Sequence, residues 1–310
     1  MPKSLVTGGA GFIGSHIVDR LVEAGHTVSI IDNLSTGRRA NINPAARFHE
    51  DDVRDGERVL AVFREEKPDY VFHLAAQMDV RKSVVDPVYD AQCNILGSLN
   101  LIEAARQVGA RKLVYASTGG AVYGEPRELP VKETHPIDPM CPYGATKHTV
   151  EHYLFMYRAN YGIDYTVLRY PNIYGPRQDP HGEAGVVAIF SQLMLAGKQP
   201  KVFGDGSQTR DYVFVSDVVD ANVLAIDGGS GGIFNLGTGV ETSVTDVFRT
   251  VAAAVGYTGE PLFAEERLGE IHRICLDASL IGKTLGWTPK HTFEQGVAKA
   301  VAYYREQAGQ

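Results

Sequence analysis

Short apolar runs alternate along the first half of the chain with longer amphipathic segments. Apolar runs of about four to eight residues are typical of strands that helices cover on both faces. The runs predicted as strands are Ser4–Thr7, Thr27–Ile31, Asp69–Leu74, Lys112–Ala116 and Tyr165–Leu168. The segments between them predicted as helices are Phe12–Ala24, Asp55–Glu66, Pro87–Val108 and Tyr143–Tyr161, with Gly25, Gly109 and Gly162 at the C-terminal cap positions. This alternation predicts an α/β fold with a Rossmann-type, doubly wound parallel sheet.

The rhythm changes at Pro171, where a loop rich in glycine, proline and aspartate begins. The elements predicted beyond it are a helix near Gly185–Ala196, short strands at Lys201–Phe203 and Gly232–Asn235, and helices near Thr245–Val255 and Phe293–Glu306. We therefore expect a Rossmann domain over residues 1–170 and a smaller C-terminal α/β lobe over residues 171–310. Part of 205–240 is expected to return to the first domain.

Composition and charge exclude several functional classes. The formal net charge of -7 argues against a surface for nucleic acid or anionic lipid. Cys93, Cys141 and Cys275 lie far apart, which excludes a disulfide framework or a thiolate zinc site as the organising feature and suits a reducing cytoplasm. The N-terminus has no apolar leader, and no apolar run reaches about 18 residues. We expect a soluble cytoplasmic protein.

A glycine-rich turn follows the first predicted strand. Gly8-Gly-Ala-Gly11-Phe-Ile-Gly14 opens the first helix, so its glycines allow a tight turn and the helix N-terminus faces a pyrophosphate. The alternative is a plain strand-to-helix turn. Asp32 ends the second strand, where a carboxylate accepts hydrogen bonds from both ribose hydroxyls of an adenosine and repels a 2′-phosphate. We therefore favour NAD over NADP, although Arg38 and Arg39 could hold a phosphate if their loop folded back.

Further cofactor contacts are expected at the carboxyl ends of the other strands, where ligands of such sheets bind. Asp52 and Val53 are placed to contact adenine, although Asp52 could equally cap the helix near Asp55. The small residues of Leu74–Ala76 leave the backbone open to a cofactor. Ser117 and Thr118 bring hydroxyls to the nicotinamide end.

Tyr143 and Lys147 are four residues apart on a predicted helix, so they share one face. An ammonium beside a phenol favours the phenolate and lowers the tyrosine pKa from about 10 toward neutrality. Tyr143 is therefore a candidate general base.

These motifs together resemble the extended short-chain dehydrogenase/reductase family, and within it the nucleotide-sugar 4-epimerases. The motifs are GGAGFIG at 8–14, Asp32-Asn-Leu-Ser-Thr-Gly37, His73-Leu-Ala-Ala76, Val122-Tyr-Gly124, Tyr143-x-x-x-Lys147, Tyr174-Gly-Pro-Arg-Gln178 and Arg210-Asp-Tyr-Val213. The resemblance implies an isomerase that inverts C4 of a UDP-hexose, UDP-glucose or UDP-galactose, through a transient 4-keto sugar. The alternatives are a UDP-N-acetylglucosamine 4-epimerase and, less favoured, a dehydratase or reductase of the same family.

The resemblance also implies roles for individual residues. Tyr143 removes the proton of the sugar 4-hydroxyl while hydride passes to NAD, and Lys147 holds the nicotinamide ribose. The implied cofactor-binding residues are Gly8, Gly11, Phe12, Ile13, Gly14, Asp32, Asn33, Ser35, Thr36, Gly37, Asp52, Val53, Leu74, Ala75, Ala76, Gln77, Asn94, Tyr143, Lys147 and Tyr170. The implied substrate-binding residues are Thr118, Asn172, Gly185, Val186, Phe203, Arg210, Arg267 and Glu270. Surface ion pairs are the alternative role for each arginine.

One departure from the family pattern falls at Gly119. The 4-epimerases carry a Ser or Thr there that bonds to the sugar and the tyrosine, so we expect Thr118, and next Ser117, to supply that hydroxyl. Strand-end hydroxyls bonding to backbone are the alternative. The related dehydratases and decarboxylases place acidic residues at this point, whereas Gly119, Gly120 and Ala121 offer none. Dehydration and decarboxylation are therefore disfavoured.

His148-Thr-Val-Glu151-His152 matches H-x-x-E-H, a zinc-peptidase motif. At about 100° per residue both histidines point away from Tyr143, and no third ligand is evident, so we expect no metal. The other rival, a non-catalytic dinucleotide sensor, would need neither Tyr143 nor Lys147.

The resemblance further implies a homodimer that pairs the helices 87–108 and 143–161, with Tyr153, Phe155, Met156 and Tyr157 as candidate contacts or core residues. A residue near the sugar controls access of N-acetyl groups, and Ile274 matches its position. We expect plain UDP-hexoses, with N-acetylated sugars as the alternative.

Overall fold

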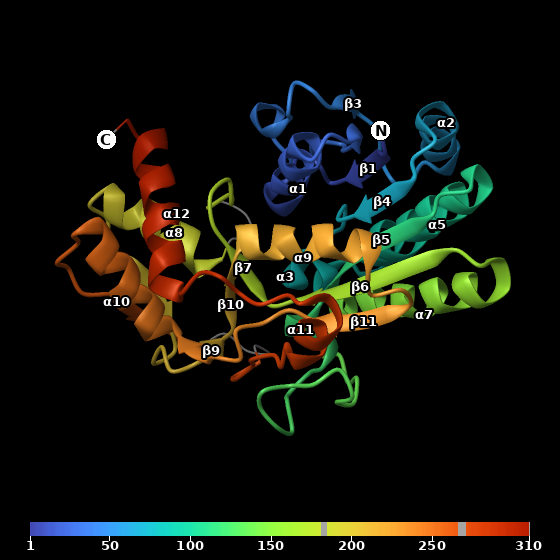
Figure 1. Cartoon of the computed structure of the whole chain (residues 1–310). Helices are drawn as coiled ribbons and strands as arrows, with labels where there is room; N and C mark the ends of the chain where they lie inside the picture. The colour runs from blue at the N-terminus through green and yellow to red at the C-terminus, as the bar shows by residue number, and fades with distance from the viewer. Residues whose placement is uncertain (181–184, 266–270, 310) are drawn as a thin grey trace.

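The computed structural model describes residues 1–180, 185–265 and 271–309. Its centre is a seven-stranded sheet in the order β11-β6-β5-β4-β1-β2-β3 (Figure 1). The strands are β1 Lys3–Thr7, β2 Thr27–Ile31, β3 Arg47–His49, β4 Tyr70–His73, β5 Lys112–Thr118, β6 Asp164–Tyr170 and β11 Gly232–Asn235. Every neighbouring pair is parallel. The predicted doubly wound parallel sheet is confirmed, and its order reverses between β1 and β4.

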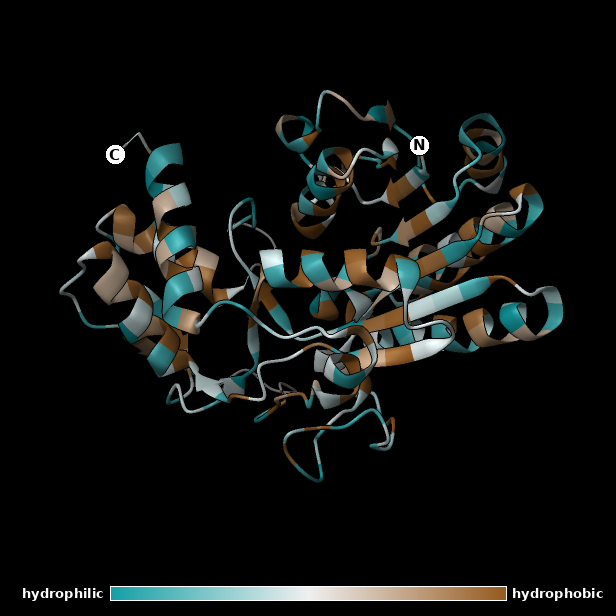
Figure 2. Ribbon diagram, viewed as in Figure 1, coloured by the Kyte–Doolittle hydropathy of each residue, from teal (hydrophilic) through white to brown (hydrophobic). Residues whose placement is uncertain are grey.

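Helices cover both faces of this sheet. One face carries α1 (Phe12–Glu23) and α9 (Val215–Asp227), whose buried residues join the larger apolar core. The opposite face carries α2 (Gly56–Glu66), α5 (Gly97–Val108) and α7 (Pro142–Tyr161), whose buried residues form a second core. Figure 2 shows hydrophobic and hydrophilic residues on different sides of these helices, as one-sided burial requires.

The predicted helix Pro87–Val108 is helical throughout but not uniform. It consists of α4 (Pro87–Ala91), a π-helical turn η2 (Gln92–Leu96) and α5. The Asp86 side chain caps its start by accepting a hydrogen bond from the backbone N–H of Tyr89. A π turn rotates the following residues relative to a regular helix and is frequent at functional sites. Asn94, a predicted cofactor residue, lies inside it.

Much of the second half of the chain forms a lobe at one end of the sheet (Figure 1). Its short strands pair as β7 Asn172–Tyr174 with β10 Tyr212–Phe214, β8 Lys201–Phe203 with β13 Leu262–Ala264, and β9 Thr209–Arg210 with β12 Thr242–Ser243. Its helices are α8 Val186–Leu195, α10 Val244–Val255 and α12 Phe293–Gln307. Smaller elements elsewhere are η1 Arg39–Asn41, α3 Val80–Val85, α6 Gly119–Val122 and α11 Ser279–Leu285.

Helix α9 has no counterpart among the predicted elements. It follows β10 without an intervening turn residue, since Phe214 both ends the strand and caps the helix. It is also rich in valine, which favours strands. Its packing against the sheet therefore overrides its local preference. Both α9 and β11 fall within residues 205–240. Helix α9 packs on one face of the central sheet, and β11 is the edge strand beside β6.

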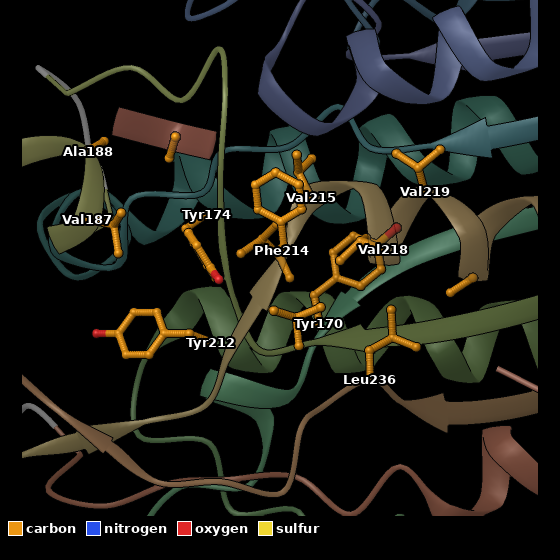
Figure 3. Close-up of a cluster of buried hydrophobic side chains, with 14 of the residues drawn as sticks. Tyr170, Tyr174, Val187, Ala188, Tyr212, Phe214, Val215, Val218, Val219 and Leu236 are labelled. Carbon is orange, nitrogen blue, oxygen red and sulfur yellow. The ribbon is translucent and has the colours of Figure 1, made fainter. Parts of the chain in front are cut away.

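The larger core joins the sheet to the second lobe. Figure 3 shows Tyr170 at the end of β6 lying close to Phe214 of β10 and Val218 of α9. The same core contains Val6 of β1 and Tyr304 of α12, which are nearly at opposite ends of the chain. No helix in the described part of the chain is long and apolar enough to cross a bilayer.

Candidate active site

The glycine turn between β1 and α1 is packed too closely for side chains. A Cβ on Gly14 would lie 2.1 Å from the carbonyl oxygen of Gly8, and a Cβ on Gly8 would lie 2.9 Å from the backbone nitrogen of Ala75. Gly8 also has a positive φ of 71°. No side chain caps α1 at Gly11, so the first-turn N–H groups, those of Phe12 and Ile13 among them, are available to an anion. These residues fit a dinucleotide pyrophosphate.

Asp32 is buried at the end of β2 beside this turn. One carboxylate oxygen accepts a hydrogen bond from Ala10 N–H at 3.0 Å and the other from Leu34 N–H at 2.8 Å. Burial raises the pKa of Asp32, against the effect of these hydrogen bonds. Arg38 pairs with Asp179 at 2.9 Å and Arg39 pairs with Glu50, so neither arginine is directed at a 2′-phosphate. The site therefore fits NAD.

Asp52 joins the loops after β2 and β3. It accepts a hydrogen bond from Asn33 Nδ2 at 2.8 Å and pairs with Arg54, which lowers the pKa of Asp52 to about 2. The cap of α2 is Asp55, whose side chain accepts from the backbone of Arg58. The alternative role of Asp52 as that cap is wrong, because the helix starts too late for it.

The remaining residues predicted to contact the adenosine lie near Asp32 and Asp52. Ser35 donates its backbone N–H to Asn33 Oδ1, and Ser35 and Thr36 are exposed. Gly37 lies so close to Asp32 that a Cβ would come within 2.8 Å of its carboxylate. Val53 packs beside Gly97 at the start of α5. These residues are brought together as predicted, although their contacts with a cofactor stay predictions.

The segment after β4 crosses the glycine turn and is held by hydrogen bonds. The backbone N–H groups of Leu74 and Ala75 both donate to Thr7 Oγ1 at 3.2 Å. Asn94 accepts from the N–H of Gln77 and donates to its carbonyl oxygen. The side chain of Asn94 thus supports the backbone of Gln77, the residue after Ala76, and its own role in binding a cofactor stays a prediction.

Lys147 is a buried cation on α7. Its side chain contacts the Tyr115 ring, with Nζ 4.3 Å from the ring centroid. Burial lowers the pKa of Lys147 to about 7, and the carboxylates of Glu151 and Asp90 act in the opposite direction. Burial also lowers the pKa of the neighbouring His73 to about 3, so this imidazole is neutral. The two carboxylates are therefore the groups that favour the ammonium form of Lys147.

Asp90 organises the surroundings of Lys147. Its carboxylate is fully buried and accepts hydrogen bonds from Thr146 Oγ1 at 2.7 Å, Gln77 Nε2 at 2.8 Å and Asn94 Nδ2 at 3.1 Å. It therefore ties α4 to α7 at the residue before Lys147. Sequence reasoning missed Asp90, although its spacing of one helical turn from Asn94 was a usable signal.

Tyr143 is half-buried in the first turn of α7, and Lys147 follows one turn later. The next residue, Gly144, packs so tightly on α6 that a Cβ would lie 2.3 Å from the carbonyl oxygen of Ala121. Because α6 directly continues β5, this contact brings Tyr143 to the end of the strand that carries Ser117 and Thr118.

The two strand-end hydroxyls have different surroundings. Ser117 donates to Glu151 Oε1 at 2.6 Å, within a buried network in which Arg169 Nε also bonds to this oxygen at 3.0 Å. Thr118 faces the other way, because a Cβ on Gly120 would lie 3.9 Å from both Thr118 Oγ1 and Asn172 Oδ1. Thr118 therefore shares a space with a predicted substrate residue, whereas Ser117 is occupied by Glu151.

Leu276 explains the departure at Gly119. A Cβ on Gly119 would lie 2.3 Å from Leu276 Cδ1. Leu276 belongs to a small buried cluster with Val122, Tyr123, Val131 and Ile274. A serine or threonine at 119 would collide with this cluster. Ile274 is 2% exposed, and its influence on sugar choice stays a prediction.

Two predicted nucleotide-diphosphate residues, Asn172 and Arg210, lie on neighbouring short strand pairs of the second lobe, Asn172 on β7 and Arg210 on β9. Asn172 pairs in register with Tyr212, and its N–H donates to the carbonyl oxygen of Asp211 at 3.0 Å. Arg210 precedes Asp211 and is half-buried. The carboxylate of Asp211 accepts from the backbone of Thr238 and Leu276, at 2.9 and 3.1 Å. Asp211, which sequence reasoning noted only as part of a motif, fixes the base of this lobe.

The other predicted substrate residues lie around the same lobe. Gly185 caps α8, Val186 is its first residue, and Phe203 ends β8. Arg267 and Glu270 fall outside the described residues. Tyr170, a predicted cofactor residue, exchanges hydrogen bonds with Asn222 through its hydroxyl, at 2.7 and 3.0 Å, so that end of the side chain faces α9.

Residues 4–237 match the model of the NAD dependent epimerase/dehydratase family. A curated relative, the UDP-glucose 4-epimerase of Mycolicibacterium smegmatis, is 49% identical over 312 residues, covering 99% of this chain and 99% of the relative.

Two solved structures share the whole fold. The UDP-glucose 4-epimerase of Thermotoga maritima, solved with UDP-glucose, is 47% identical with a TM-score of 0.98 and covers 99% of each chain. The UDP-glucose 4-epimerase of Thermus thermophilus, solved with NAD, is 47% identical with a TM-score of 0.93 and covers 98% of this chain and 99% of its own. Similarity of this extent covers the glycine turn, the sheet and the second lobe together.

Proposed function

The chain belongs to the NAD dependent epimerase/dehydratase family, and from that premise we propose that it is a UDP-glucose 4-epimerase. Such an isomerase inverts C4 of the hexose and interconverts UDP-glucose and UDP-galactose. The observation that supports the proposal is the packing of Gly144 on Ala121, because it brings the helix of Tyr143 and Lys147 to the end of β5 that carries Thr118.

The chain's own residues supply positioning and proton transfer. Tyr143 takes the proton of the sugar 4-hydroxyl and returns it after the keto sugar has presented its other face. Lys147, whose ammonium form Glu151 and Asp90 favour against the effect of burial, stabilises the phenolate of Tyr143 when it is protonated. Thr118 donates a hydrogen bond to the reacting oxygen. NAD, held by the glycine turn and Asp32, supplies the acceptor and then the donor of hydride.

In the proposed mechanism the nucleotide part of the substrate provides most of the binding affinity. The sugar can therefore be held loosely and can rotate to present its other face. In this proposal Arg210 binds the diphosphate, Asn172 donates an amide to the UDP part, and Phe203 flanks the base. Gly119, Gly120 and Ala121 form α6 beside Thr118 and carry no acidic group. Elimination of water across C5–C6 would need such an acid, so reversible oxidation is the reaction that fits.

Replacing Tyr143 with Phe tests the mechanism. Y143F removes only the hydroxyl, so we expect turnover to fall at least about 100-fold, the usual contribution of a general base, while NAD and UDP-glucose still bind. The matched control is Y153F, which removes a hydroxyl from the same helix. The measurements are the epimerase rate and the affinities for NAD and UDP-glucose of Y143F and Y153F. Unchanged turnover in Y143F would contradict the mechanism.

Sugar choice is tested by one preparation assayed with two substrate pairs. We expect faster conversion of UDP-glucose and UDP-galactose than of their N-acetylated counterparts, because Ile274 leaves less room than a minimal side chain. A higher kcat/KM for the N-acetylated pair would favour a UDP-N-acetylglucosamine 4-epimerase instead.

We also propose a homodimer built on the outer side of the helical layer formed by α4, η2, α5 and α7. Val88, Leu96 and Phe155 are 65%, 54% and 63% exposed there, and Met156 is 41% exposed. A shallow apolar groove runs along α4 and η2, lined by Pro87, Val88, Ala91, Gln92, Ile95 and Leu96. A second copy would cover this surface, since monomers rarely expose large contiguous apolar patches.

Light scattering tests the dimer. The native chain should show twice the monomer mass at micromolar concentration, and F155E should show the monomer mass because a buried carboxylate at the interface is unpaired. L280E is the control, since Leu280 is 41% exposed on α11, away from this layer. A monomer mass for the native chain would refute the proposal.

The compartment we propose is the cytoplasm. Cys93, Cys141 and Cys275 are all free thiols, and Cys93 and Cys275 are buried. Free thiols of this kind persist where the surroundings are reducing.

A further inference from the structure

His148 and His152 lie one turn apart on α7, on the side that faces away from Tyr143. Their Nε2 atoms are 3.1 Å apart, and their rings cross at 70° with centroids 4.6 Å apart. His152 is exposed, and the side chain of His148 is 24% exposed. The two Nε2 atoms therefore lie within the spacing of a chelating pair at the protein surface.

Glu151 fixes the orientation of His148. Its Oε2 lies 3.0 Å from His148 Nδ1, and because a carboxylate only accepts, Nδ1 carries the proton. The lone pair of His148 Nε2 is therefore directed toward His152. Glu151 is itself held by Arg169 and Ser117, so the imidazole is supported by a buried network. A carboxylate behind a histidine is the usual support of a metal ligand.

We propose that His148 and His152 form a surface site for a divalent transition-metal cation of the Ni²⁺, Cu²⁺ and Zn²⁺ class. Metal–imidazole bonds of about 2.0–2.1 Å that meet at roughly 90° to 110° place the two nitrogens about 2.9 to 3.4 Å apart. The observed spacing fits that range. Water completes the coordination, since His152 is exposed. Imidazole pairs select this class of cation over Mg²⁺ and Ca²⁺.

The site is not that of a zinc peptidase. In the H-x-x-E-H motif the glutamate acts as a general base beside the metal, whereas both oxygens of Glu151 are occupied, Oε1 by Ser117 and Oε2 by His148. Without a metal the two Nε2 atoms share a hydrogen bond at the same spacing. Binding requires His152 to move its proton from Nε2 to Nδ1 and both rings to turn so that their lone pairs meet at the ion. The spacing of the two nitrogens thus exists before the ion arrives.

A second group of potential ligands is blocked. His49, Glu65 and Glu66 lie close enough to hold an ion, but Arg47 pairs with both carboxylates, at 3.3 Å to Glu66. The positive guanidinium of Arg47 neutralises the two carboxylates that would have to bind the cation.

Nickel titration of the full-length chain, prepared without a histidine tag, tests the site. We expect saturable binding of one Ni²⁺ per chain by calorimetry, and loss of that binding in both H148Q and H152Q. H272Q is the matched control, because His272 is exposed elsewhere. Binding should weaken at acid pH, since protons compete for the imidazoles.

Thermal unfolding provides an independent readout. An ion that binds only the folded helix raises Tm, so Ni²⁺ should raise Tm of the native chain and of H272Q but not of H148Q or H152Q. Circular dichroism without metal checks that all variants are folded. The proposal is overturned if the native chain shows no saturable Ni²⁺ binding, or if H148Q and H152Q bind Ni²⁺ as tightly as the native chain does.

Discussion

Lys147 shows how single buried charges set up the chemistry. Burial lowers the pKa of Lys147 to about 7, so the ammonium that Tyr143 needs depends on nearby carboxylates. Asp90 and Glu151 meet this need from two sides, and each is fixed by hydrogen bonds of its own. Burial raises the pKa of Glu151, but the hydrogen bonds from His148 and Arg169 outweigh it and hold that pKa at about 2. The proposed catalytic pair thus relies on carboxylates that lie outside the proposed sugar site.

Paired alanine variants separate the roles of Thr118 and Ser117. T118A should lower kcat/KM by roughly 10 to 100-fold, the cost of one hydrogen bond to a charged oxygen, with little change in stability. S117A should lower the free energy of unfolding by about 1–3 kcal/mol, because it leaves Glu151 short of a buried donor, and should change turnover less. Steady-state assays and urea denaturation measure both effects. The assignment is wrong if S117A loses more activity than T118A at unchanged stability.

At the scale of elements, close approach of backbone segments decides where side chains act. Gly144 lets α7 rest on α6, and Gly119 lets α6 rest on Leu276. Each contact moves a catalytic group by fixing the element that carries it. The missing hydroxyl at 119 is therefore a consequence of packing, and in the proposed mechanism Thr118 takes its place from the preceding position.

A double-mutant cycle tests the contact between Gly119 and Leu276. G119A should destabilise the protein by about 1–3 kcal/mol, as overpacking does. L276V removes the Cδ atoms that a Cβ at 119 would meet, so in that background the cost of G119A should fall by about 0.5 kcal/mol or more. Urea denaturation of the four proteins gives the coupling. Additive effects would show that Leu276 is not the obstacle.

At the scale of the whole molecule, one core holds the sheet and the second lobe together. The larger core includes Val6 and Val114 of the sheet, Val218 of α9 and Val301 of α12. Strand β11 completes the edge of the sheet beside β6, although it follows the second lobe in the chain. The substrate lobe is therefore built onto the cofactor domain through shared packing, which keeps Asn172 close to Thr118.

A fragment of residues 1–170 should consequently fail to fold. It lacks α9, which covers one face of the sheet, and β11, which protects the edge of β6. We expect weak near-ultraviolet circular dichroism and no cooperative thermal transition, whereas the full chain shows both. The same fragment co-expressed with residues 171–310 serves as the control. A cooperative transition in the isolated fragment would show that the first domain is independent.

The sequence by itself determined the parallel sheet, the glycine turn, Asp32 and the Tyr143 and Lys147 pair. These features depend on local rules, namely apolar periodicity, the φ angles that glycine permits and the helical repeat, which residues near in sequence obey. The NAD preference also followed, because the carboxylate and the turn adjoin the same two strands.

Only the tertiary structure decided that the Ser117 hydroxyl bonds to Glu151, why position 119 is glycine, and which carboxylates surround Lys147. It also added α9 and showed that the Nε2 atoms of His148 and His152 lie side by side. Each of these depends on contacts between residues far apart in the chain, such as Ser117 with Glu151 and Gly119 with Leu276. Side-chain volume and hydrogen-bond partners at such contacts are fixed by packing, which local patterns do not encode.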